Sequence, residues 1–119
     1  MIHAAGGCAI IKSDDPDVIQ RLNQEAAAAL AAGRAAGLNI TEAQAMAWIT
    51  ANPAKAMGLK DTGSLTPGKR ADVVIWDKNP FSIYARAERV YLDGGIAYDR
   101  HDARFQPKSD FEIGQGANR

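Results

Sequence analysis

The sequence predicts a mixed α/β chain in which the first half is mainly helical and the second half mainly β. Alanine dominates residues 26–36, which favours a helix because alanine loses the least conformational freedom there. β-Branched residues follow a Pro-Gly turn near residue 67, and an Asp-Gly-Gly sequence near residue 94 is typical of a tight hairpin. With 119 residues, the chain is long enough to bury one modest core.

The first half begins with a short apolar run and continues as a long helix. Residues 8–11, with the sequence Cys-Ala-Ile-Ile, predict a buried strand. Asp15 and Pro16 then predict a helix start, because a carboxylate can cap backbone N–H groups and proline loses no hydrogen bond at the first helical position. We expect this amphipathic helix to run from Asp17 to a stop at Gly37.

Two shorter helices are expected next. Thr41 and Gln44 fit a capping box, which predicts a helix that ends near Ala51. The Asn-Pro pair at residues 52–53 predicts the cap and the first residue of a third helix, with Asn52 as the cap. Gly58 is expected to end it, because glycine readily adopts the left-handed conformation found after helices.

The second half is predicted to be a small sheet. Residues 66–69 have the sequence Thr-Pro-Gly-Lys and predict a type II turn, since Pro and Gly occupy its two central positions. Strands are expected at residues 71–76, 89–92 and 96–98, the last two joined as a hairpin. The polar residues 99–119 predict an extended or partly disordered tail.

Charge and cysteine content exclude several classes of protein. Fourteen basic residues balance fourteen acidic ones, so we expect no binding to nucleic acid. No stretch approaches the roughly 20 apolar residues that span a bilayer, so no membrane association is expected. Cys8 is the single cysteine, which excludes an internal disulfide and favours a cytoplasmic setting.

Three segments, taken in order, resemble the end of amidohydrolase-superfamily enzymes, particularly the imidazolonepropionase-like and prolidase-like groups. Ile10-Ile11-Lys12-Ser13-Asp14-Asp15-Pro16 is similar to the eighth strand of their TIM barrel. Residues 40–59, with Asn-Pro-Ala-Lys, resemble the helices that follow that strand. Residues 63–77, with Gly-Lys-Arg-Ala-Asp-Val-Val, resemble the return of the chain into a small β-sandwich beside the barrel.

The resemblance implies a division of the chain into three parts. Residues 1–58 would be the last strand-helix unit of a TIM-barrel amidohydrolase with its following helices. Residues 59–98 would be a small sheet from the accessory β-sandwich, and residues 99–119 the polar C-terminal tail.

The resemblance also implies a catalytic and metal-binding role for Asp14, which matches the carboxylate at the end of the eighth barrel strand; Asp15 is the poorer match. In the complete family a divalent metal, often zinc, lowers the pKa of a bound water, and the resulting hydroxide attacks an amide or cyclic amide carbon of a small-molecule substrate. Asp14 would take the proton of that water and pass it to the leaving nitrogen.

The sequence lacks the other ligands of such a site. The family's His-x-His motif, its bridging lysine or glutamate and its later histidines have no counterpart, and His3 and His101 are expected to be solvated. A catalytic zinc usually has three protein ligands, so one carboxylate does not hold it. We therefore expect the isolated chain to be inactive and to contain no metal.

Four other residues receive structural interpretations. Cys8 is expected in the core, and Trp48 and Trp76 are expected to serve packing. Asp72 interrupts an apolar strand, and we expect its carboxylate to bind backbone amides supplied by the turn at residues 66–69.

Three hypotheses about function remain open. The chain is the C-terminal portion of a metal-dependent hydrolase that acts on non-peptide carbon–nitrogen bonds, or one subunit of a split enzyme whose partner supplies the barrel. Alternatively, it is a noncatalytic module that binds a partner or pairs with itself as a homo-oligomer, because a lone barrel strand and half a sandwich leave strand edges unpaired.

Overall fold

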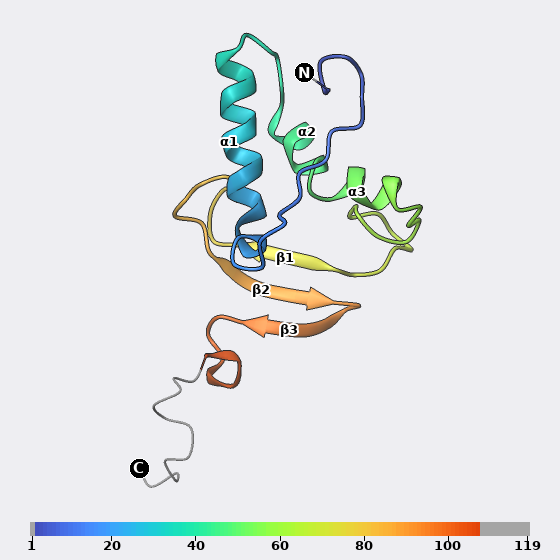
Figure 1. Cartoon of the computed structure of the whole chain (residues 1–119). Coiled ribbons are helices and arrows are strands. Elements are labelled where there is room, and N and C mark those ends of the chain that lie inside the picture. The colour runs from blue at the N-terminus through green and yellow to red at the C-terminus, as the bar shows by residue number, and fades with distance from the viewer. Residues whose placement is uncertain (1, 108–119) are drawn as a thin grey trace, which may run out of the picture.

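The computed structural model of the chain describes residues 2–107 and confirms the mixed α/β class (Figure 1). A 3₁₀ turn, η1 (Ile19–Arg21), leads into the helices α1 (Leu22–Ala35), α2 (Glu42–Ala47) and α3 (Ala51–Ala56). An antiparallel sheet follows, with strands β1 (Val73–Trp76), β2 (Ala87–Leu92) and β3 (Gly95–Asp99) in that spatial order, and then a 3₁₀ turn, η2 (Ala103–Phe105). Residues 108–119 of the predicted tail lie outside the described residues, but the expectation of an extended or partly disordered chain is wrong for residues 99–107, which complete β3 and form η2.

The predicted strand at residues 8–11 is wrong. The segment is extended and packs Ala9 and Ile11 against the core, but its hydrogen bonds to the helical half are one from Ile11 N to Trp48 O (3.1 Å) and one from Asn52 Nδ2 to Ala9 O (2.7 Å). A strand needs a ladder of bonds to a second strand, and residues 2–107 place none beside it. Cys8 is accordingly exposed, and its predicted place in the core is also wrong.

Helix α1 starts later than predicted and ends where predicted. The Asp15 carboxylate does accept a bond from Asp17 N (2.8 Å), but this closes a tight turn, and the chain passes through η1 before the α-helix begins at Leu22. At the other end Gly37 has a φ of 81°, and Leu38 N donates to Gly33 O (3.1 Å). These features form a Schellman motif, which confirms the predicted stop.

The two short helices keep most of their predicted signals. The Thr41–Gln44 capping box is present in both directions at the start of α2. Gly58 has a φ of 73° and ends α3 as predicted. Asn52 is not the cap of α3, because the helix begins at Ala51 and the Asn52 side chain instead binds the backbone of the N-terminal segment.

The helices enclose a small core to which the β1–β2 loop (residues 77–86) is attached. Trp48, which is 5% exposed, packs with three other buried side chains, and Phe81 of the loop lies against them. The three are Leu30, Ile40 and Ala45. Beside the core, the buried Asn23 donates to Pro80 O (2.5 Å), so this loop fastens the sheet to the helices.

The sheet has the turns that the sequence predicts. Lys69 N donates to Thr66 O (3.1 Å) and Gly68 has a φ of 86°, as a type II turn requires. Asp93 (φ 51°) and Gly94 (φ 79°) form a two-residue hairpin turn of type I′ between β2 and β3.

Both faces of the sheet expose apolar side chains. Val74 pairs with Val90 and Ile75 with Arg89, so alternation along β1 places Val74 and Ile75 on opposite faces, yet each is 44% exposed. Leu92 and Ile96 are more than half exposed. Within residues 2–107, therefore, neither face has a complete cover. No helix in this part of the chain has the length and apolar character needed to cross a membrane.

Candidate functional site

Asp14 lies in a bend directly after the extended N-terminal segment. Its Oδ1 accepts a hydrogen bond from Lys12 Nζ at 2.5 Å, and the Lys12 and Asp14 side chains are 75% and 84% exposed. Side chains two residues apart in an extended chain lie on the same side, which is why the sequence brings this pair together. The Asp14 carboxylate thus faces solvent beside a single cation.

The neighbouring carboxylate of Asp15 is used differently. Its Oδ1 accepts from Asp17 N (2.8 Å), and its backbone carbonyl accepts from Val18 N and Ile19 N (both 3.2 Å). Ser13 Oγ also accepts from Asp15 N (3.1 Å). Asp15 therefore closes the turn, while the Asp14 carboxylate faces solvent. The catalytic role of Asp14 stays a prediction.

The described residues do not fit a resident catalytic metal. Residues 2–107 contain no group of three His, Cys, Asp or Glu side chains that could hold one. His3 packs edge-on against Trp48, with ring centroids 5.5 Å apart, and His101 donates to Glu88 Oε2 (2.7 Å). Both histidines were predicted to be solvated. The His101 side chain is 70% exposed, which agrees with the prediction, whereas His3 is half-buried against Trp48.

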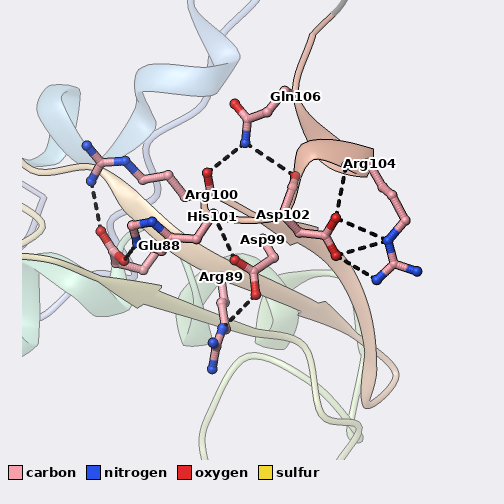
Figure 2. Close-up of polar contacts among 8 residues, drawn as sticks. All are labelled: Glu88, Arg89, Asp99, Arg100, His101, Asp102, Arg104 and Gln106. Atoms are coloured by element: carbon pink, nitrogen blue, oxygen red, sulfur yellow. Dashed lines mark hydrogen bonds and ion pairs between the residues drawn. The ribbon is translucent and has the colours of Figure 1, made fainter.

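A charged cluster that the sequence interpretation missed lies at the end of the sheet (Figure 2). The two Glu88 oxygens accept from Arg100 Nη1 (2.8 Å) and His101 Nε2 (2.7 Å). These bonds, led by that of His101, hold the pKa of Glu88 below its usual range. Arg89 Nε also donates to Asp99 at 2.9 Å. A regular hairpin register from the two-residue turn would place Arg89 opposite Tyr98, and the register shift between Val90 and Tyr91 places it opposite Asp99 instead, so the sequence offered no signal for this pair.

Asp72 joins the start of β1 to the hairpin. Its carboxylate accepts from the Arg70 guanidinium (Nε, 2.7 Å) and from Asp93 N (2.9 Å), and these bonds lower its pKa. The predicted structural role agrees with this arrangement, but the amide comes from the hairpin turn. The prediction that residues 66–69 supply this amide is therefore wrong. The hairpin turn lies beside Asp72 because Gly94 N donates to Ala71 O (3.0 Å), and this brings the Asp93 amide to the carboxylate.

A model of the amidohydrolase family matches residues 12–98, which is most of the chain and includes Asp14. The chain therefore belongs to the amidohydrolase family.

Two curated relatives match shorter stretches. An imidazolonepropionase of Paracoccus denitrificans is 50% identical over 38 residues, which cover 32% of this chain and 10% of the relative. A dihydroorotase of Lactobacillus acidophilus is 51% identical over 77 residues, which cover 48% of this chain and 18% of the relative. The chain thus spans less than a fifth of the length of these relatives.

A solved structure resembles most of this chain. The crystal structure of an amidohydrolase from Thermotoga maritima superposes with a TM-score of 0.72 at 34% sequence identity. The match covers 82% of this chain and 24% of that chain. The helices and the sheet therefore occur in this order within a larger amidohydrolase.

Proposed function

We propose that the chain is the C-terminal portion of a hydrolase that cleaves non-peptide carbon–nitrogen bonds of a small-molecule substrate, and that it contributes Asp14 to the active site. The observation on which this depends is the placement of Asp14, whose carboxylate faces out of a turn closed by Asp15, inside the family match. Such a carboxylate can take a proton from an attacking water and deliver it to the leaving nitrogen.

The remaining groups of the reaction would come from other parts of a complete enzyme. Asp14 is paired with Lys12, and residues 2–107 contain no group of three His, Cys, Asp or Glu side chains that could hold a metal, so a catalytic metal would need ligands outside this part of the chain.

The uncovered surfaces support the same proposal. The segment at residues 8–13 bonds the helices at Ala9 and Ile11, which leaves most of its backbone groups open to neighbouring strands. Trp48 Nε1 is buried without an acceptor among the described residues. We propose that neighbouring barrel strands flank residues 8–13 and supply that acceptor, with residues 1–58 as the barrel portion and residues 59–98 as the sandwich portion.

The test begins with the coding sequence directly upstream. An in-frame segment with a His-x-His motif supports the proposal, and the longer protein is then assayed for hydrolysis of a panel of cyclic amides. Asp14→Asn is expected to lower the rate by about 10²-fold or more, as loss of a general base does. Asp15→Asn, the matched control, is expected to keep most of the rate. Equal losses, or a start codon with no barrel upstream, would contradict the proposal.

The alternative, a noncatalytic module that pairs with itself or with a barrel on another chain, is favoured by one observation. The outer edges of β1 and β3 have no strand partner in residues 2–107, and the apolar side chains on both faces are exposed. Light scattering of the purified chain distinguishes these hypotheses: a dimer supports self-pairing, and a monomer removes it. Copurification with a histidine-rich polypeptide would support the split enzyme.

A further inference from the structure

Residues 100–107, called the C-terminal strap below, fold back at the end of the sheet after β3 (Figure 2). Arg100 N donates to Glu88 O (2.9 Å), which extends the β2–β3 pairing by one step. The strap then forms the η2 turn, in which Asp102 accepts from Arg104 N (2.9 Å) and Gln106 Nε2 donates to Arg100 O (2.6 Å). These bonds inside the strap make it a compact unit.

The two shortest bonds between the strap side chains and the rest of the protein are to Glu88, and a longer one is to Asp77. Both Glu88 oxygens are occupied, by Arg100 and His101, and Arg100 Nη1 also lies 3.4 Å from Asp77 Oδ2. Burial contributes little, because η2 contains no buried residue. The strap is therefore held mainly by charge-assisted hydrogen bonds, which are among the stronger single contacts in proteins but are weakened by salt at exposed positions.

The strap forms one wall of a groove of about 540 Å³ between the helices and the sheet. Arg100, Gln106 and Pro107 line the strap side of this groove. Gln20 and Gln24, at the start of the helical half, line the groove as well, and so do the half-buried rings of Trp76 and Tyr98 from the sheet. The two rings therefore line the same groove as the strap.

We propose that the C-terminal strap is a gate on this groove, held closed by the Glu88 carboxylate and opened when the bonds of Glu88 to Arg100 and His101 are broken. The internal bonds of the strap do not involve the Glu88 carboxylate. The backbone N–H groups of Arg100 and His101 are bonded to Glu88 O (2.9 Å) and to Asp99 Oδ1 (2.9 Å), and these bonds stay in place as the hinge about which the strap moves. The β2–β3 hairpin keeps its own register and turn, and the sheet remains folded when the gate opens. The gate is independent of the function proposed for Asp14.

Trp76 reports on the gate, because it lies in the groove and the other tryptophan, Trp48, is buried in the core. The experiment measures quenching of Trp76 fluorescence by acrylamide, a neutral quencher, after subtraction of the Trp48 signal recorded with Trp76→Phe. Glu88→Gln removes the charge at nearly constant volume. The matched control is Arg104→Gln, which breaks the Arg104–Asp102 pair inside the strap and leaves Glu88 intact.

We expect the quenching constant of Trp76 to rise about twofold or more in Glu88→Gln and to stay unchanged in Arg104→Gln. Wild-type protein should approach the Glu88→Gln value in 1 M NaCl, where the Debye length falls to about 3 Å. An unchanged constant in Glu88→Gln, or equal rises in both variants, would overturn the proposal. If circular dichroism shows that Glu88→Gln has lost its fold, the wild-type salt titration decides alone: a constant that does not change with salt refutes the gate.

Discussion

Trp48 provides a quantitative test of how the helical half is held together. Its side chain is 5% exposed and packs against Leu30, Ile40 and Ala45. Replacing a buried Trp with Ala typically costs about 3–5 kcal/mol of stability, because apolar contacts are lost and a cavity remains. The indole N–H, however, is buried without an acceptor among the described residues, and such a donor costs about 1–3 kcal/mol while it stays unpaired.

The cost of losing the ring and the cost of the unpaired donor have opposite signs, so two variants of Trp48 are expected to differ in stability. Trp48→Ala removes ring and donor together, so we expect a net loss of about 2 kcal/mol, and at most about 4 kcal/mol, in the free energy of unfolding. Trp48→Phe keeps most of the ring and removes the unpaired donor, so its cost should stay within about 1 kcal/mol. Urea denaturation followed by far-ultraviolet circular dichroism measures both variants. If Trp48→Phe loses as much as Trp48→Ala, the indole N–H has an acceptor and the reasoning is refuted.

Three further predictions concern pH, a helix end and a helix cap. The pKa values of Asp72 and Glu88 are lowered in the folded chain, so their stabilising effect is present above the unfolded pKa of about 4 and is lost as the pH falls through the folded pKa values. The urea concentration at the unfolding midpoint should therefore decrease when the pH is lowered below about 5. This decrease should be less steep in Asp72→Asn and Glu88→Gln. Gly58→Ala should lower the free energy of unfolding by about 1 kcal/mol in the same titration, because φ is 73° at this position. An added Cβ meets no atom within 4 Å, so backbone strain is the whole effect. An unchanged free energy of unfolding would contradict the left-handed conformation of Gly58 at the end of α3. Thr41→Ala should cost about 1 kcal/mol through loss of the capping box, whereas Thr66→Ala, a control in an exposed turn, should change stability by less than about 0.5 kcal/mol.

The features predicted correctly depend on residues that are close in the sequence. Each of these features needs hydrogen bonds only between residues a few positions apart. They are the Thr41–Gln44 capping box, the helix stops at Gly37 and Gly58, and the hairpin turn at Asp93-Gly94. The family resemblance was carried by ordered segments of the sequence and is confirmed by the match to residues 12–98.

The features that the sequence interpretation missed depend on partners far along the chain. Residues 8–11 have the composition of a strand, but a strand exists only when another strand pairs with it, and the described chain supplies helix contacts from Trp48 and Asn52 instead. Asp72 receives its backbone amide from Asp93, 21 residues away, and not from the adjacent turn.

By itself, therefore, the sequence determined the fold class, the turns, the helix stops at Gly37 and Gly58 and the family, because local hydrogen bonds and residue order suffice for these. The end of α2, predicted near Ala51, lies at Ala47 and was missed. The tertiary structure alone decided which carboxylates are bound by residues far along the chain. Glu88 accepts from Arg100 and His101 of the strap, and Asp72 accepts from the backbone amide of Asp93 in the hairpin turn. The physical reason is that the partners of a charged side chain depend on the path of the whole chain, which residue spacing does not encode.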